Sequence, residues 1–310
     1  MECLPVNASE YNVLFSEPCI AYQSVAFNEL NAGKVDRLHF LHLKEAKSIA
    51  GIIVGESNGV WRSPFSAPFG GITFINAEVR IEVIESALDC LLNYAFSKGM
   101  RFEITLPPLF YDKAFYSRLV FSLLRFSAPT YADINYAFDL QGTADYTSVL
   151  QREGRRNLKK AKTFTYVFEV ATSQEKKQIA YDLIKQNKES KGYPLKMSFS
   201  DLESTMQNIP GQYFVLHMEG KPVAGAVVLQ VTPKIAQMIY WGDPPGFSAY
   251  RPVNLLACEL FHFYKQAGFA YLDIGPSSQE GIANIGLCHF KETIGSFADL
   301  KYHFSMQGSE

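Results

Sequence analysis

The two halves of this chain repeat one order of predicted elements, and this repetition is the feature that most limits its fold. In residues 38–106, and again in residues 213–274, the pattern predicts a β-hairpin, an irregular loop rich in aromatic residues, proline and glycine, a long helix and a short strand. Gly99 and Gly268 stand where a glycine cap ends each long helix. Such elements bury their apolar faces by packing helices on a mixed sheet, so we expect an α/β (α+β) chain of two similar domains.

The spacing of apolar residues places the individual elements. In the first half, strands are predicted over residues 35–43, 48–54, 102–106 and 135–140, and helices over residues 77–98 and 113–124. In the second half, strands are predicted over residues 166–170, 213–217, 223–231, 235–241 and 270–274, and helices over residues 151–162, 174–186, 201–208 and 253–266. We therefore expect one domain over residues 1–143 and a second, which includes the helix at 151–162, over residues 144–310.

Length and composition limit the class of protein. A chain of 310 residues is long enough for two domains, and its 47% hydrophobic content is that of a globular protein. Its net charge of −2 gives no general attraction to polyanions, so we expect no DNA partner, and any phosphate must bind at a local patch. Residues 1–10 do not resemble a secretory signal, and no apolar run is long enough to cross a bilayer. A soluble, cytoplasmic protein is expected.

Several kinds of site are not indicated. The five cysteines are scattered without a Cys-x-x-Cys pair, and the six histidines form no His-Glu-x-x-His pattern. We therefore expect reduced thiols and no metal. The signatures of P-loop ATPases, dinucleotide enzymes and lipase-type hydrolases are also absent from the sequence.

Residues 151–162, QREGRRNLKKAK, are the densest run of charge. At about 100° per residue the apolar side of a helix here is formed by Leu150, Gly154, Leu158 and Ala161. The cationic side chains share one broad arc: Arg152, Arg155, Arg156, Lys159, Lys160 and Lys162. Such a helix can dock on its narrow side and present a cationic stripe to phosphate. A helix that is simply solvated is the alternative.

Near the C-terminal end, residues 271–295 predict a buried strand, a turn, a polar loop and a short helix that ends at Gly295. The strand carries Asp273 and the helix carries Lys291. Two opposite charges are thus placed near one strand end, where sites in α/β folds gather. Either Lys291 acts in chemistry, or an Asp273–Lys291 ion pair only ties the loop to the strand.

The spacing Gly286-Leu287-x-x-Phe290-Lys291-x-x-x-Gly295, after Asp273-x-Gly275, resembles the last part of FemAB-like proteins of the GNAT acyltransferase superfamily. This resemblance implies two tandem GNAT-like domains, each a mixed β-sheet flanked by helices. It also implies that an amine attacks an activated acyl group directly, without a covalent enzyme intermediate. The catalytic residues would be Lys291, Asp273 and Phe290, with Lys291 stabilising the oxyanion and Asp273 or the substrate taking the proton.

The same resemblance indicates where substrates bind. The basic helix would hold a tRNA or a nucleotide-linked substrate through Arg152, Arg155, Arg156 and Lys159. Residues 241–252 occupy the place of the glycine-rich loop with which related proteins bind coenzyme A. Here the glycine spacing differs and prolines remove N–H donors, although Arg251 can still bind one phosphate.

Aromatic and glycine residues complete the candidate site. Tyr240, Trp241 and Tyr250 are expected to line an acceptor pocket. The alternative is that Tyr240 and Trp241 only cap the sheet core. Gly70 and Gly71 allow a close approach of the main chain to a ligand, or form a plain turn.

The expected function is therefore N-acyl or aminoacyl transfer to an amine of a cell-envelope or polysaccharide precursor. The acceptor is a small molecule, sugar or peptide, and the donor is an acyl-coenzyme A or an aminoacyl-tRNA. Two alternatives remain: an N-acetyltransferase that uses acetyl-coenzyme A, and a non-catalytic tandem-GNAT binding protein.

Overall fold

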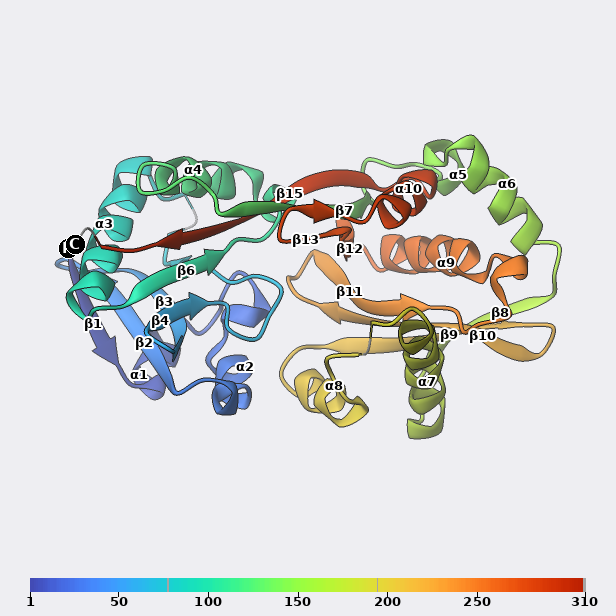
Figure 1. The fold of residues 1–310 in the computed structure, drawn as a ribbon, viewed down its shortest axis with the longest axis horizontal. Helices are drawn as coiled ribbons and strands as arrows, with labels where there is room; N and C mark the ends of the chain where they lie inside the picture. Colours follow the sequence, from blue (N-terminus) through green and yellow to red (C-terminus); the bar gives the residue numbers. More distant parts are fainter. Residues whose placement is uncertain (77, 194, 309–310) are drawn as a thin grey trace. The chain divides into compact units, whose positions relative to one another are not determined.

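The computed structural model describes residues 1–76, 78–193 and 195–308, and the chain forms two compact units (Figure 1). Unit 1 comprises Met1–Ile134, Glu280–Ile282 and Asp299–Glu310, and unit 2 comprises Asn135–Gln279 and Ala283–Ala298. The expected domains, residues 1–143 and 144–310, have a different boundary from these compact units. The expected boundary stays a prediction about which parts of the chain fold independently.

Unit 1 is built on a sheet with strand order β1-β2-β3-β4-β6-β15, and β5 pairs with β3. Its strands are β1 (Glu2–Val6), β2 (Arg37–Lys44), β3 (Ser48–Ser57), β4 (Val60–Ser63), β5 (Thr73–Phe74), β6 (Arg101–Thr105) and β15 (Phe297–Met306). Its helices are α1 (Ala8–Leu14), α2 (Val25–Leu30), α3 (Ile81–Ser97) and α4 (Lys113–Leu123), with 3-10 turns at Ala21–Gln23, Ala32–Lys34 and Leu109–Tyr111.

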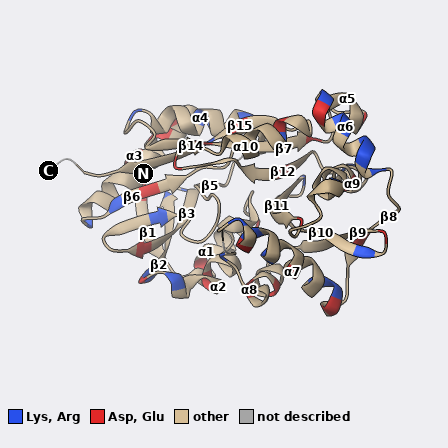
Figure 2. Ribbon diagram, turned by 45° about the vertical axis from the view of Figure 1, so that its right-hand side comes forward, with Lys and Arg blue, Asp and Glu red and all other residues tan. Residues whose placement is uncertain are grey.

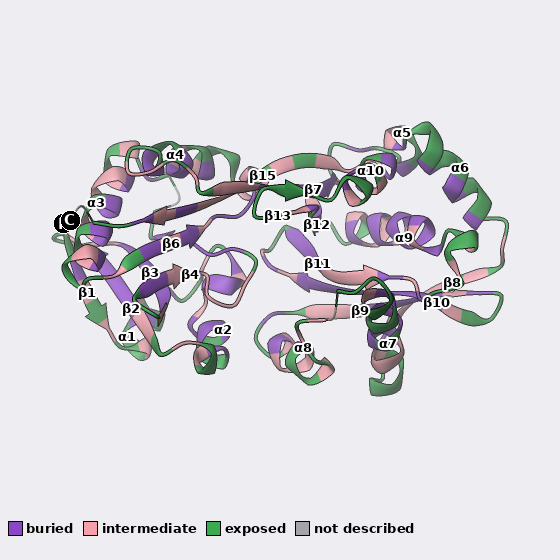
Figure 3. Cartoon of the chain, in the orientation of Figure 1, coloured by how far each residue is buried: buried purple, intermediate pink, exposed green. Residues whose placement is uncertain are grey.

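Local signals in unit 1 explain its helices. The buried positions of α3 recur at helical spacing, and Gly99 follows the helix with a positive φ of 72°. The predicted start of this helix at Ala77 lies outside the described residues. Asp112 caps α4 by accepting a hydrogen bond from the main-chain nitrogen of Phe115 over 2.9 Å. Figure 3 shows the buried sides of α3 and α4 facing into the unit.

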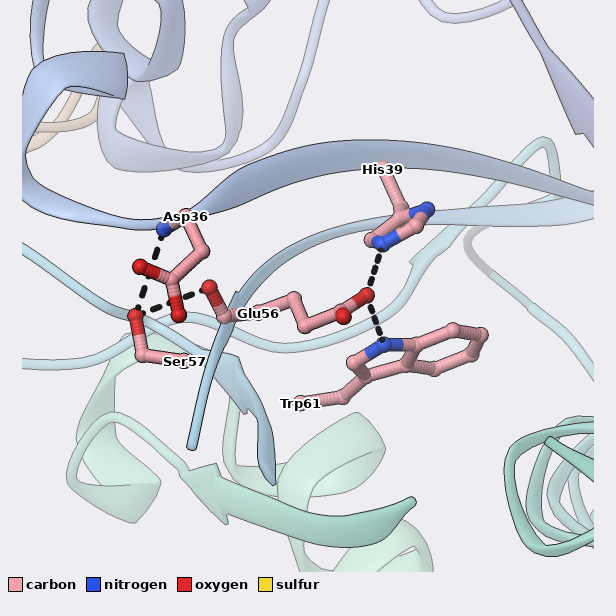
Figure 4. A network of polar contacts seen from close by, with 5 residues as sticks. All are labelled: Asp36, His39, Glu56, Ser57 and Trp61. Atoms are coloured by element: carbon pink, nitrogen blue, oxygen red, sulfur yellow. Dashed lines mark hydrogen bonds and ion pairs between the residues drawn. The ribbon is translucent and has the colours of Figure 1, made fainter. Parts of the chain in front are cut away.

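A polar network lies across the hairpin of unit 1 (Figure 4). Glu56 on β3 accepts hydrogen bonds from Trp61 Nε1 over 3.1 Å and from the His39 ring over 2.6 Å. The hydrogen bonds from Trp61 and His39 hold the pKa of Glu56 below its usual value. The network links β2, β3 and β4 and so fixes their register.

Unit 2 is built on a sheet with strand order β7-β12-β11-β10-β9-β8. Its strands are β7 (Tyr131–Asp139, which enters the unit at Asn135), β8 (Tyr166–Ala171), β9 (Gly211–Met218), β10 (Lys221–Gln230), β11 (Ile235–Gly242) and β12 (Tyr271–Pro276). Its helices are α5 (Tyr146–Val149), α6 (Arg152–Ala161), α7 (Gln174–Ser190), α8 (Phe199–Met206), α9 (Pro252–Gln266) and α10 (Ile285–Thr293), with a 3-10 turn at Ser248–Tyr250. The short strands β13 (Ser278–Gln279) and β14 (Ile282–Ala283) follow β12 in the chain.

Helices cover both faces of this sheet, as the alternation along β9 demonstrates. Tyr213 and Val215 belong to the cluster that packs against α7 and α8. Phe214, between them, contacts the rings of Phe263 and Tyr264 on α9, at centroid distances of 5.1 and 6.0 Å. Because successive side chains of a strand point to opposite faces, α7 and α9 lie on opposite sides.

The repeat predicted from the sequence is present in the strand directions. In unit 1, β3 and β4 are antiparallel, β4 and β6 are parallel with α3 between them, and β6 and β15 are antiparallel. In unit 2, the pairs β10–β11, β11–β12 and β12–β7 follow the same sequence of directions, with α9 between β11 and β12.

Six helices and strands of unit 1 were not predicted: β1, α1, α2, β4, β5 and β15. The prolines and glycines of residues 61–72 indicate that this segment cannot be regular for long, and the short strand β4 occupies Val60–Ser63 at its start. The last strand, β15, pairs with β6 although most of unit 2 separates the two in the chain. Pairing over such a distance leaves no local turn signal, which is why the pattern missed it.

Candidate active site

The site is centred where two parallel strands of unit 2 part. β11 and β12 pair only from Ile235–Tyr271 to Gln237–Asp273, although β11 continues to Gly242 and β12 to Pro276. On its other edge, β11 changes register against β10 between Val227 and Val228, as in a β-bulge. The carboxyl ends of the two parallel strands are thus not paired with each other. Ligands of α/β sheets bind beyond such strand ends.

Asp273 stands at the last pair before the strands part. Its side chain is fully buried, and its carboxylate accepts hydrogen bonds from Asn135 Nδ2 (2.7 Å), Gln237 Nε2 (2.9 Å) and the main-chain nitrogen of Gly275 (2.8 Å). These donors come from β7, β11 and β12 itself. The carboxylate therefore joins three neighbouring strands and holds the turn that follows it.

Lys291 is placed by the short helix α10. Asn284 caps the helix by accepting a hydrogen bond from the main-chain nitrogen of Leu287 over 3.0 Å. The Lys291 side chain is only 2% exposed, and its Nζ donates to the carbonyl oxygens of Gly275 (2.7 Å) and Pro276 (3.0 Å). The predicted short helix is therefore present, and the ammonium of its buried lysine donates hydrogen bonds to the end of β12.

The surroundings of this ammonium decide its protonation. Burial lowers the pKa of Lys291 to about 7, and the charge of Lys188 acts in the same direction, while Asp273 and Cys288 act against it. Nζ also lies 5.6 Å from the centroid of the Tyr136 ring. Lys291 therefore exchanges a proton near neutral pH, unlike an exposed lysine.

Phe290 and Trp241 lie together, whereas Tyr240 lies elsewhere. The rings of Trp241 and Phe290 are 5.8 Å apart, which brings the end of β11 against α10. Tyr240 packs against the cluster of α7 and α8, and burial raises its pKa. Tyr240 is thus partly buried beside the cluster of α7 and α8, and Trp241 lies beside Phe290.

The loop after β11 carries two more of the predicted substrate-binding residues, Tyr250 and Arg251. Tyr250 packs against Phe164 at a centroid distance of 4.8 Å. Arg251 is exposed and has the left-handed φ of 57° at the N-cap of α9, and Pro252 begins the helix. No side chain of the described residues caps this helix end, so Arg251 is available to an anion there.

The basic helix has the form that its sequence predicts. In α6, Gly154, Leu158 and Ala161 are buried, and the predicted binding residues Arg152, Arg155, Arg156 and Lys159 are exposed. The blue side of α6 is visible in Figure 2. Gly154 contacts the end of α10, because a Cβ at this position would lie 2.0 Å from the carbonyl oxygen of Thr293. The structure thus attaches the basic helix to the helix of Lys291, which the sequence alone did not indicate.

The glycine pair lies in unit 1. Gly70 donates its main-chain N–H to the carbonyl oxygen of Thr105 over 2.9 Å, and Gly71 has a φ of 132°. Ser63 fills the space beside Gly70, where a Cβ would lie 2.7 Å from its Oγ. Both glycines are buried, and the close contact with Ser63 leaves no room for a side chain at Gly70.

Sequence reasoning missed Asn135, Gln237 and Lys188. Asn135 and Gln237 lie inside strands, where an isolated amide carries no motif. Their signal is a polar residue at a buried strand position, which requires a partner. Within the described ranges, no group of three or more His, Cys, Asp or Glu side chains is arranged to hold a metal. None of the described helices combines the length and apolar character that crossing a membrane requires.

Comparisons with known proteins agree with this geometry. Residues 150–292 match the family model of the acetyltransferase (GNAT) domain. No curated protein sequence matches the chain. Among solved structures, FemX superposes with a TM-score of 0.67 at 11% identity and covers 98% of this chain and 97% of its own.

Two further structures are similar over almost the whole chain. L-PGS from Bacillus licheniformis has a TM-score of 0.59 at 14% identity, covering 98% of this chain and 93% of its own. The C-terminal domain of a putative lysylphosphatidylglycerol synthetase from Agrobacterium fabrum has a TM-score of 0.58 at 11% identity, with the same coverage. The comparisons therefore agree with the resemblance to FemAB-like proteins: residues 150–292 match a GNAT domain, and the chain as a whole has the fold of FemX.

Proposed function

We propose that this chain is an acyltransferase that moves an aminoacyl group, or another acyl group, onto an amine of a cell-envelope precursor. The GNAT domain supports acyl transfer, and the similarity to FemX and to a lysylphosphatidylglycerol synthetase favours an aminoacyl donor. The observation that carries the proposal is the buried Lys291 ammonium at the parting of β11 and β12.

The chemistry requires one stabilised charge. The amine nitrogen attacks the carbonyl carbon of an ester or thioester, a C–N bond forms, and the carbonyl electron pair moves to oxygen. Lys291 donates a hydrogen bond to this oxyanion, turning from the carbonyl oxygens of Gly275 and Pro276. The intermediate then expels the alkoxide or thiolate, which takes the proton that the amine loses.

The other predicted catalytic residues position Lys291. Asp273 already accepts three hydrogen bonds and is fully buried, so we assign to the substrate the uptake of the proton that the amine loses. Asp273 instead fixes the turn at the end of β12. Phe290, with Trp241, fixes α10 against the end of β11. Both residues act through the lysine.

The basic helix favours a polyanionic donor. Four exposed cations, Arg152, Arg155, Arg156 and Lys159, lie on a helix that packs against α10, so a tRNA held there would reach towards Lys291. The family model's description, acetyltransferase, favours coenzyme A as a second candidate. Pro244, Pro245 and Pro252 remove N–H donors from the loop that would hold its pyrophosphate, which weighs against it.

The test compares two lysines that make similar contacts. Lys265 on α9 also donates to two carbonyl oxygens, those of Leu140 and Thr143. Purified protein is incubated with aminoacyl-tRNAs or acyl-coenzyme A thioesters and amine acceptors, and amide products are measured by mass spectrometry. We expect Lys291→Met to lower turnover ~10²–10³-fold with nearly unchanged substrate affinity. Lys265→Met should keep turnover per folded molecule.

Three outcomes separate the alternatives. Product from acetyl-coenzyme A alone would favour the N-acetyltransferase. Saturating ligand at about 100 times its dissociation constant adds ~2.7 kcal/mol to stability, so binding is visible in thermal shifts. Binding without product from any donor would favour the non-catalytic protein, and equal losses in both lysine variants would make Lys291 structural.

A further inference from the structure

The last turn of α7 is fixed to the end of β11. Asn187 is 5% exposed, and its Nδ2 donates to the main-chain oxygen of Asp243 over 2.6 Å. Gly242 permits this approach, since a Cβ there would lie 2.5 Å from Cγ of Asn187. The same end of β11 meets α10 through the Trp241 and Phe290 rings. The last turn of α7 and helix α10 therefore border the same stretch of β11.

Lys188, the next residue on α7, is partly buried. Other lysines of this helix face carboxylates: Lys176 with Glu169, Lys177 with Glu203 and Lys185 with Glu189. For Lys188, no carboxylate or hydrogen-bond acceptor accompanies the ammonium in the described part of the chain. Burial and the charge of Lys191 lower its pKa. A half-buried cation without a counter-charge is unfavourable until an anion binds it.

Lys188 and Lys291 share one electrostatic environment, because the charge of Lys188 lowers the pKa of Lys291. Ser277 adds a third group. Its hydroxyl is buried and has no hydrogen-bond partner among the described residues. Ser277 directly follows Gly275 and Pro276, whose carbonyl oxygens hold Lys291. Ammonium and hydroxyl groups donate hydrogen bonds, so a ligand that binds them must offer several acceptor oxygen atoms.

We propose that Lys188 belongs to the same site as Lys291 and that these two lysines, with Ser277, bind an anionic oxygen group, a carboxylate or a phosphate, of the substrate. Only the assignment of this anion to the transfer substrate rests on the proposed function. The bound anion offsets the repulsion between the lysines. Lys291 is then protonated when the acyl group arrives, which is the state that an oxyanion requires.

The test measures the protonation of Lys291 directly. Protein labelled with ¹³C at the lysine Cε atoms is titrated by NMR, and the Lys291 signal is assigned by its loss in Lys291→Met. We expect Lys188→Met to raise the pKa of Lys291 above about 7 in the free protein, since one repelling charge is removed. Inorganic phosphate and acetate are then added in separate arms. We expect one of them to raise the pKa of Lys291 in the wild type, and the arm that does so identifies the anion as phosphate or carboxylate.

Matched variants make the result specific. Lys185→Met removes a lysine of the same helix that is paired with Glu189, and it should behave as the wild type. Lys188→Met should weaken anion binding about tenfold or more, and Lys188→Arg should restore it. An unchanged Lys291 titration in Lys188→Met, or equal anion binding in all variants, would overturn the inference. Anion binding without acyl transfer would support the inference and reject the proposed function. Acyl transfer without anion binding would support the proposed function and reject the inference.

Discussion

At the scale of single residues, Lys291 and Asp273 are each held by several hydrogen bonds. Asp273 is held by amide and main-chain donors, and Lys291 holds two carbonyl oxygens. Each group is buried, so each needs these partners to remain in the core. The proposed acyl transfer therefore depends on how far the protein lowers the pKa of Lys291.

The lowered pKa of Lys291 predicts a pH dependence of stability. In the unfolded chain a lysine has a pKa of about 10.4, and in the folded protein Lys291 has a pKa of about 7. Between these values the unfolded state binds a proton that the native state does not, so the free energy of unfolding rises with pH over this range. Below about pH 7 both states are protonated and the contribution no longer changes. Urea unfolding of wild type and Lys291→Met from pH 7 to pH 9.5 measures it: the wild type should gain stability relative to the variant. Parallel curves would contradict the burial of a titrating lysine.

At the scale of elements, α6 and α10 meet at a glycine. Gly154 lets the basic helix approach the carbonyl end of α10, and the main-chain nitrogen of Gln151 donates to the carbonyl oxygen of Thr293 over 3.2 Å. The basic helix is thus oriented by the helix that carries Lys291. A substrate bound on the cationic side of α6 is thereby placed relative to the lysine.

This packing predicts the effect of a single methyl group. Gly154→Ala would place Cβ 2.0 Å from the carbonyl oxygen of Thr293, so the two helices must separate. We expect a loss of about 1–3 kcal/mol in the free energy of unfolding, the usual cost of overpacking. Gly286→Ala in α10 is the matched control, because its Cβ would be 3.7 Å from the nearest atom, Oδ1 of Asn284. That variant should keep stability or gain about 0.4–1 kcal/mol. Equal stabilities of the two variants, measured by urea unfolding, would show that α6 does not pack as described.

At the scale of the whole molecule, each predicted half of the chain, residues 1–143 and 144–310, supplies a strand that pairs with a strand of the other half. Residues of β7 follow the helices of unit 1 in sequence but pair with β12 of unit 2. The end of the chain, in β15, returns to pair with β6 of unit 1. The duplicated sheets are therefore completed by an exchange of strands.

The exchange predicts how fragments behave. A fragment of residues 1–143 lacks β15, which pairs with β6, and a fragment of residues 144–310 lacks β7, which pairs with β12. We expect neither fragment alone to show a cooperative thermal transition in circular dichroism, because each sheet has an unpaired strand edge. Co-expression should restore a cooperative transition. Independent folding of both fragments would instead support the boundary at 143 and 144 as one between autonomous domains.

Elements with strong local signals were predictable from the sequence. The basic helix was expected over residues 151–162 and is found at Arg152–Ala161, and the helix expected over 253–266 is found at Pro252–Gln266. Their apolar spacing and terminal residues act within a few positions, so they need no tertiary information. The short helix around Phe290 and Lys291 was likewise predictable and is found at Ile285–Thr293, whereas the catalytic role proposed for it came from the resemblance to FemAB-like proteins.

Contacts between distant residues were beyond such reasoning. Asn135, Gln237 and Asp273 meet because three strands from different parts of the chain become neighbours. Lys188 influences the pKa of Lys291 only because folding fixes the last turn of α7 to the residue after β11. The depressed pKa of Lys291 depends on this burial and on charges far away in the chain, and neither exists before folding. Local spacing thus determined most helices and strands, because their signals lie within a few residues. The exchanged strands and the electrostatics of the site depend on contacts between distant residues, so they arose only from packing.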